Sequence, residues 1–329
     1  MSTGFKTATV ASADVPATQT NFPVYIDLSR LGITTQADAD SVRVYADSSK
    51  TTEWAREIVS ATEMHVKVPS LTSTTSIYVY WDGTSADYAV TDTYGRNAVW
   101  SGYSAVYHLS NTTDSTGNGF TLTGINSPTL SVGVFGNNNS SYQYGGSNYH
   151  ISPTNILDCT SSIPNATIST WVKPEITTRG DHLGQWPHHL LKSGMTASRF
   201  RAQSNYSTNA IATDTSNYSL NTWYHNVFTL NDSSFLVELF VNGASKITGT
   251  GSGTRTYSNQ PLALGGEYVS GVSYNRFTGS LDEVRVSLGI LSPNWITTEY
   301  NNQSDEAGFW GTWSDVGGAT NTTNFFLMM

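Results

Sequence analysis

Carboxylates that stand close together in the chain are the first candidates for chemistry, because glycoside hydrolysis uses two of them facing one cleft. Asp282 and Glu283 are adjacent in a run that reads as a β-strand, so we expect their side chains to point to opposite faces. Such a pair cannot serve one cleft. The other close pairs lack a matching strand and are predicted to be surface charges: Glu53 with Glu57, and Asp305 with Glu306.

Histidines gather at one place, where His182, His188 and His189 surround a Trp-Pro segment. Histidine is a frequent zinc ligand, but Asp181 is the only other ligand type nearby, so a packing or binding loop is the favoured interpretation. The chain has no Gly-x-Ser-x-Gly elbow, no phosphate-binding Gly-Lys-Ser/Thr loop and no dinucleotide fingerprint after a predicted strand. We therefore predict a protein that is not an enzyme.

Aromatic side chains in loop-like surroundings are candidates for binding sugars, because a flat ring complements the apolar face of a sugar. The alternative for each is that it packs against its own loop. The candidates are Trp186, Tyr206, Tyr218, Tyr268 and Tyr274.

The composition suits many short strands. The chain has 329 residues, enough for about two domains. Charged residues make up only 12% of it, aromatic residues another 12%, and the remaining polarity is mainly Thr, Ser, Asn and Gly. With 16 basic against 25 acidic residues and no basic stripe, a nucleic-acid partner is excluded. No run is apolar enough for a membrane span, no export signal is seen at the N-terminus, and the single Cys159 forms no intrachain disulfide.

Alternating apolar and polar residues place strands along most of the chain. In the first unit they are expected at 22–28, 41–45, 63–68 and 76–81, and in the second at 166–172, 222–228, 235–241 and 281–286, among others. Asn242-Gly243 after a strand predicts a hairpin turn. One short helix is expected at 292–300, with Ser292 as its N-cap and Pro293 at its first position. A last strand is expected at 308–313.

Several segments, taken in order, resemble concanavalin A-like laminin G-type domains. They span about residues 100–290 and include Val106-Tyr-His-Leu109, Asp114-Ser-Thr-Gly-Asn-Gly119, Ile168-Ser-Thr-Trp-Val172, Leu239-Phe-Val-Asn-Gly243 and Phe277-Thr-Gly-Ser-Leu-Asp-Glu-Val-Arg-Val286. The first unit is similar to a family of unknown function that commonly precedes such domains. The resemblance implies an all-β fold of two tandem antiparallel β-sandwiches, the second a concanavalin A-like jelly roll, with one short C-terminal helix. The expected domains are residues 1–95, residues 96–317 and an apolar tail at 318–329.

The resemblance also implies a structural calcium ion, because relatives often hold one at positions that correspond to Asp114 and Asp282. Asn118, in the same Gly/Asn loop, would add an amide oxygen, and calcium takes such oxygen ligands. The alternative is that Asp114 closes an Asx turn and Asp282 caps a strand edge. Relatives commonly carry an aromatic-Asp-Gly segment where this chain has Tyr144-Gly145-Gly146, which predicts weaker calcium binding.

Tandem adhesin-like sandwiches belong on an exterior surface, yet this chain shows no export signal and has one cysteine. A virion protein reconciles the two, since it is made in a host cytoplasm and used outside it. We expect a capsid decoration, head-fibre or tail-fibre protein of a bacteriophage. Its expected partners are other virion proteins, further copies of itself as a homo-oligomer, and a host glycan or receptor. The tail residues expected to anchor it are Phe325, Phe326, Leu327, Met328 and Met329.

Three other functions remain open. The first is a purely structural spacer of a virion. The second is a cellular adhesin or surface-layer subunit, located at a cell surface. The third and least favoured is a polysaccharide-cleaving enzyme, which needs two carboxylates converging in a cleft.

Overall fold

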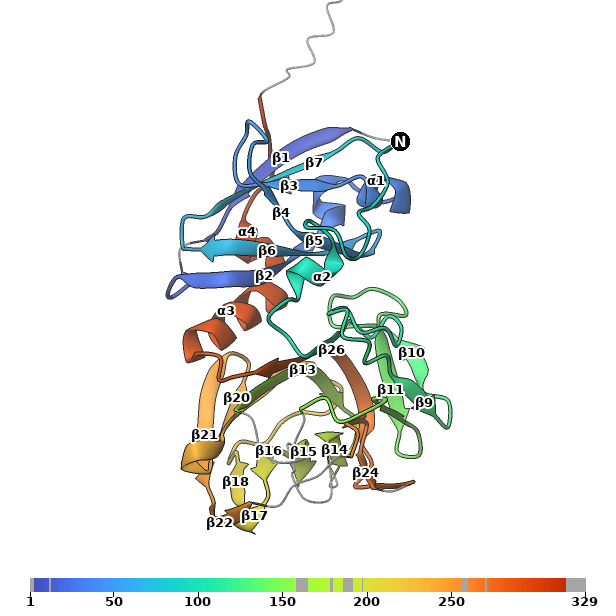
Figure 1. Ribbon diagram of the computed structural model, residues 1–329, viewed down its shortest axis with the longest axis vertical. Coiled ribbons are helices and arrows are strands. Elements are labelled where there is room, and N and C mark those ends of the chain that lie inside the picture. Colours follow the sequence, from blue (N-terminus) through green and yellow to red (C-terminus); the bar gives the residue numbers. More distant parts are fainter. Residues whose placement is uncertain are drawn as a thin grey trace, which may run out of the picture.

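The computed structural model describes residues 3–11, 13–157, 165–177, 180–185, 192–196, 198–255, 260–269 and 271–317. Figure 1 shows two β-rich units stacked along the long axis of the molecule, with helix α3 (Pro293–Ser304) between them. The predicted class of two antiparallel β-sandwiches with a short helix near the C-terminus is confirmed. Among the described helices, none combines the length and the hydropathy that crossing a bilayer requires.

The first sandwich consists of two facing sheets. One has the order β27 (Ser314–Asp315), β1 (Gly4–Thr9), β7 (Ser76–Trp81), β3 (Arg43–Tyr45) and β4 (Glu53–Trp54), and the other β2 (Gln19–Asp27), β6 (Glu63–Leu71) and β5 (Arg56–Ser60). Its short helical segments are η1 (Leu28–Leu31), α1 (Gln36–Asp40) and, in the linker to the second sandwich, α2 (Arg96–Val99). The alternation read from the sequence decides which side chains enter the core: Ile77, Val79 and Trp81 of β7 do so.

The second sandwich also has two main sheets. The sheet nearer the first unit has the order β10 (Thr129–Ser131), β11 (Ser141–Gly145), β26 (Thr278–Leu288), β13 (Ala166–Pro174), β19 (Tyr224–Asn231), β20 (Leu236–Val241) and β21 (Ala244–Thr250), with β8 (Ala105–Tyr107) paired to β26. The other has the order β18 (Ala210–Thr213), β16 (Arg199–Ser204), β15 (Lys192–Thr196), β14 (Gly180–Gly184), β23 (Ala263–Leu264), β12 (Tyr149–Ile151) and β9 (Thr123–Ile125).

Turns join these strands where the sequence places them. Asn242 and Gly243 both have positive φ, of 52° and 73°, as a two-residue hairpin turn between β20 and β21 requires. Two further two-stranded sheets lie beside the main ones: β17 (Tyr206–Thr208) pairs with β22 (Ser252–Arg255), and β24 (Glu267–Val269) forms a hairpin with β25 (Val272–Tyr274). A turn η2 (Asp232–Ser234) connects β19 to β20.

The C-terminal segment returns to the first sandwich. The prediction of a strand at 308–313 is wrong. Residues Glu306–Trp310 form helix α4, which is capped by Asp305, and β27 follows it. Phe309, Trp310 and Trp313 are buried in the core of the first sandwich, and β27 pairs with β1. Residues assigned by sequence to the second domain, 96–317, thus include a segment that completes the first.

Helix α3 contacts both sandwiches. Asn302 exchanges two hydrogen bonds with the backbone of Tyr25 in β2, at 2.6 and 3.0 Å. On its other side Ile296 packs on Val227 and Phe240, which belong to the second sandwich. The helix is therefore a shared layer that fixes the two units against each other.

The start of α3 provides a first prediction. The Ser292 hydroxyl accepts a hydrogen bond from the Trp295 backbone N–H at 3.1 Å, as the sequence predicted. We expect Ser292→Ala to lower the free energy of unfolding by about 1 kcal/mol, because an N-terminal N–H loses its acceptor. Urea unfolding measures the change, with Ser292→Asp as the control that keeps a cap. Equal stability of Ser292→Ala and wild type would contradict the prediction.

Candidate functional site

Asp114, the first predicted calcium ligand, is buried in the loop after β8. Its carboxylate accepts hydrogen bonds from the backbone N–H groups of Val106, Thr116 and Phe120 at 3.0–3.2 Å, and from the Thr116 hydroxyl. Asn118 follows in the same loop, and its amide donates to the carbonyl oxygen of Ser104 at 3.0 Å. These contacts suit the Asx-turn alternative, since the loop itself supplies donors to the carboxylate.

Asp282, the third predicted ligand, contacts a different loop. Its Oδ2 accepts from the Val134 N–H and its Oδ1 from the Glu283 N–H, both at 2.8 Å. A Cβ placed on Gly133 would lie 2.5 Å from Oδ2, so the loop backbone approaches this carboxylate closely. The calcium site stays a prediction.

The predicted sugar-binding tyrosines are not alike in exposure. Tyr206 belongs to the core of the second sandwich, and Tyr218 packs against Phe200 while its hydroxyl donates to Asp214. Tyr268 is half-buried beside Tyr149. Tyr274, on β25, is 49% exposed and is the candidate open to a ligand. Trp186 and the tail residues 325–329 lie outside the described residues.

The histidine segment is described only in part. His182 is buried in β14 between the rings of Phe200 and Phe277, and burial lowers its pKa to about 3. His182 therefore contributes to packing in its neutral form. His188, His189 and Cys159 lie outside the described residues.

A cluster of buried charged side chains occupies the junction between the sandwiches. Glu63 and His65 come from β6 of the first sandwich, and His108 and Glu283 come from the second. All four are buried, and one possible ligand atom from each lies within 4.8 Å of those of the others. Among the described residues this is the place where such atoms gather, and we call it the junction cluster.

Regular alternation explains half of the junction cluster. Met64 and Val66 of β6 enter the core of the first sandwich, so Glu63 and His65 share the opposite face, which is turned to the second sandwich. Because every second residue of a strand points to the same face, the carboxylate of Glu63 and the imidazole of His65 lie on one side of β6.

A β-bulge explains the other half and corrects a prediction from the sequence. Leu281 and Val284 both enter the core of the second sandwich, which leaves two consecutive outward residues, Asp282 and Glu283. The β13–β26 register shifts here, and Glu283 has a φ of 46°, a left-handed conformation that non-glycine residues rarely adopt. The expectation that these side chains point to opposite faces is wrong, because the extra residue keeps both on the junction side.

Arg285 continues the outward face of β26. Its guanidinium donates to Glu283 at 2.7 Å and to Glu299 of α3 at 2.8 Å, and it lies 4.9 Å from the Trp100 ring. All of these side chains are buried. Arg285 thereby joins the junction cluster to helix α3.

Two predicted surface charges are buried instead. Glu57 accepts hydrogen bonds from the Trp100 indole, from the Ser115 hydroxyl at 2.7 Å and from Nε2 of His108 at 3.0 Å. Glu306, the first residue of α4, accepts a hydrogen bond from the Arg30 guanidinium at 2.5 Å. Their burial comes from contacts between distant segments, which the local sequence does not reveal.

Electrostatics in the junction cluster differ from residue to residue. Burial, followed by the neighbouring Glu283 carboxylate, raises the pKa of Glu63 to about 8. Burial lowers the pKa of His65 well below its ordinary value. Burial also opposes charge on His108, but the carboxylates of Glu283 and Glu57 outweigh it and hold the pKa of His108 well above its usual range. The His65 and His108 rings stack at 4.5 Å.

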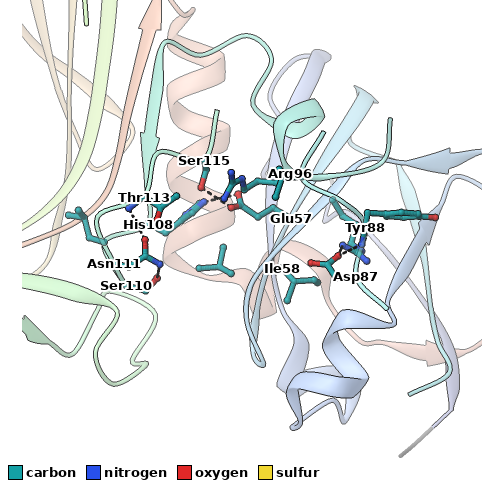
Figure 2. A pocket seen from close by; sticks show the side chains of 14 residues that line it. Glu57, Ile58, Asp87, Tyr88, Arg96, His108, Ser110, Asn111, Thr113 and Ser115 are labelled. Carbon is teal, nitrogen blue, oxygen red and sulfur yellow. Dashed lines mark hydrogen bonds and ion pairs between the residues drawn. The ribbon is translucent and has the colours of Figure 1, made fainter. Parts of the chain in front are cut away.

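A pocket of about 240 Å³ opens beside the junction cluster. Figure 2 shows Glu57 and His108 in its wall, with Ser115, Asn111 and Arg96 around them. The pocket is lined by residues of both units and leads from the surface to the outer side of His108. Of the four members of the junction cluster, His108 is the one that lines it.

Sequence reasoning missed this site, although one signal was available. Glu63-x-His65 on a predicted strand places two ligand types on one face. His108 and Glu283 carried no comparable signal, because their approach depends on how the two sandwiches pack.

Comparison with known proteins bears on the second sandwich. Residues 144–297 match the laminin G-type model described as the concanavalin A-like lectin/glucanases superfamily. The second sandwich has a lectin-like fold. No curated protein matches the chain.

Solved structures with a similar fold include domain 4 of AbnA, a GH43 extracellular arabinanase from Geobacillus stearothermophilus, in complex with arabinotriose. It is 23% identical, with 59% of this chain and 96% of that chain covered and a TM-score of 0.48. The binding domain of Paraclostridial Mosquitocidal Protein 1 is 14% identical, covering 60% of this chain and 51% of that chain (TM-score 0.48). The botulinum neurotoxin serotype D binding domain is 14% identical, covering 61% and 51% (TM-score 0.47).

Proposed function

We propose that this protein is a non-enzymatic binding protein that presents the second sandwich to a glycan or a glycosylated receptor. The match of residues 144–297 to a lectin/glucanase superfamily carries the proposal. Both chain segments that flank the second sandwich belong to the first, so the second is held out from it (Figure 1). The end farther from the first sandwich is then the face available to a ligand.

The β24–β25 hairpin is the proposed contact surface at that end (Figure 1). Val272 and Tyr274 are two residues apart on β25, so they share a face, and each is about half exposed, at 48% and 49%. Asn275 follows and donates to Glu267 at 2.9 Å, which holds the hairpin end in place. An exposed ring beside fixed polar groups is suited to stacking a sugar and bonding its hydroxyls.

The carboxylates support binding without catalysis. Asp282 and Glu283 share a face, but both are buried at the junction, and their oxygens are engaged by backbone N–H groups, His108 and Arg285. Glycoside cleavage needs carboxylates that face a sugar-sized cleft.

Tyr274→Ala tests the proposal. On a glycan array followed by calorimetry with the best glycan, we expect wild type to bind and Tyr274→Ala to bind at least about tenfold more weakly, as for an aromatic residue at a binding hot spot. Leu288→Ala is the control, because Leu288 is 56% exposed on another strand. Absence of any glycan or glycoprotein ligand, or equal binding by Tyr274→Ala, would overturn the proposal.

We further propose that the protein works at the surface of a virion. The support is the chain's charge-poor surface rich in hydroxyl and amide groups and its single cysteine. Mass spectrometry of purified particles tests this, and deletion of residues 318–329 tests the tail as the anchor. Absence from particles would overturn the virion location; unchanged incorporation of the shortened chain would overturn the anchor.

A further inference from the structure

We propose that the junction cluster is a zinc site that joins the two sandwiches. Its ligands would be Glu63 and His65 from the first sandwich and His108 and Glu283 from the second. The site is separate from the proposed glycan surface, and its ligand Glu283 is the chain neighbour of Asp282, one of the predicted calcium ligands.

The distances between the ligand atoms carry the proposal. Oε1 of Glu63 lies 3.4 Å from Nε2 of His65 and 3.8 Å from Nδ1 of His108, and Nε2 of His65 lies 3.8 Å from Oε2 of Glu283. A tetrahedral site with bonds of about 2.0–2.1 Å has ligand–ligand distances of about 3.3–3.4 Å. The contact between His108 and Glu283, 2.5 Å from Nδ1 to Oε1, is a hydrogen bond. It uses the other oxygen of Glu283 than the contact with His65 does, so the carboxylate would turn to offer one oxygen to the metal. The distance from Nδ1 to that oxygen is the one that changes most. It would lengthen by about 0.8 Å when a metal replaces the shared proton.

The ligand types select the metal. Two imidazole nitrogens beside two carboxylate oxygens suit zinc, which accepts nitrogen and oxygen ligands in a tetrahedral arrangement. Calcium and magnesium prefer six or more oxygen ligands, so a four-atom set with two nitrogens disfavours them. A divalent cation would also offset the charge of the buried Glu63 carboxylate and would take the place of the His108 proton beside Glu283, which Arg285 pairs from the other side.

Outer contacts hold the ligands in position. The other ring nitrogen of His108 contacts Glu57, and Glu57 is itself fixed by Trp100 and Ser115. Metal-binding histidines usually pair their second nitrogen with a carboxylate in this way. Arg285 orients Glu283 from the other side, at 2.7 Å.

The pocket of about 240 Å³ in Figure 2, whose wall includes Glu57 and His108, approaches the junction cluster from the side of Glu57. Glu63, His65 and Glu283 do not line it, so a cation would have to pass His108 to reach them. Once bound, the metal would tie the two units together, because each contributes two ligands.

Zinc titration of the full chain tests the proposal. After dialysis against a chelator, calorimetry should show one zinc bound per chain, and zinc should raise the melting temperature. Substitution of zinc by cobalt should give the intense visible absorption of a tetrahedral site. We expect Glu63→Gln and His65→Gln to abolish the cobalt spectrum, and Glu57→Gln to weaken zinc binding by about 10–100-fold, as removal of an outer-sphere partner does.

Glu306→Gln and His225→Gln are the matched controls, because both remove a buried group outside the junction cluster. They should bind zinc like wild type. The substitutions at Glu63 and Glu57 keep side-chain shape, and circular dichroism identifies any variant that fails to fold. The proposal is overturned if wild type binds no stoichiometric zinc, if cobalt gives no tetrahedral spectrum, or if folded Glu63→Gln binds zinc as tightly as Glu306→Gln does.

Discussion

Replacement of Arg285 by methionine is expected to lower the free energy of unfolding by about 3–5 kcal/mol, the cost of removing one partner from a buried ion pair. Arg285 donates to Glu283 and to Glu299, and all three side chains are almost completely buried. Methionine fills similar space but leaves both carboxylates facing the junction without their cation. Urea unfolding followed by fluorescence measures the loss.

Two further variants make the Arg285 result specific. Arg199→Met changes an exposed arginine and should alter stability by no more than about 0.5 kcal/mol. Adding Glu299→Gln to Arg285→Met should recover part of the loss, since one of the stranded charges is then removed. A loss for Arg285→Met no larger than that for Arg199→Met would contradict the role we give to this side chain.

Trp310→Ala is expected to be the most damaging apolar truncation, at about 3–5 kcal/mol. Trp310 is fully buried between Phe309 and Trp313 in the first core, and its indole donates to the Tyr25 carbonyl at 3.2 Å. The substitution leaves a cavity and removes one of the two donors to the Tyr25 carbonyl oxygen, which keeps its hydrogen bond from Asn302. Because α4 follows α3 directly, we also expect the junction to loosen.

Calorimetry and limited proteolysis check the Trp310 prediction. The melting temperature should fall, and cleavage near residue 305 should accelerate. Trp223→Ala is the control, because Trp223 is partly exposed and its main ring contact is with Lys173, so its loss should cost about 1 kcal/mol. If Trp310→Ala and Trp223→Ala have the same melting temperature, Trp310 does not hold the C-terminal segment on the core of the first sandwich.

Local patterns in the sequence were sufficient for much of the fold. Alternation predicted the strand at 76–81, which is β7 with Ile77, Val79 and Trp81 in the core, and Ser292-Pro293 marked the start of α3, because these signals lie within a few neighbouring residues. The class of the second sandwich came instead from the resemblance of several motifs, in order, to laminin G-type domains.

The junction could not be predicted, for physical reasons visible at particular residues. Glu283 adopts a left-handed conformation although its residue type does not favour one, so strict alternation misplaced it. Glu57 carries no mark of burial in its own strand; Trp100, Ser115 and His108 bury it. The aromatic type likewise does not distinguish a core residue such as Tyr206 from an exposed one such as Tyr274.

The pairing of β1 with β27 has a mechanical consequence. The two strands run antiparallel, and the Val316 N–H donates to the Phe5 carbonyl at 2.8 Å, so the described chain enters and leaves the first sandwich at one edge. A pulling force applied between these two points would first unzip β27 from β1, one hydrogen bond at a time. The second sandwich lies outside this load path, so it would keep its folded surface while the first yields.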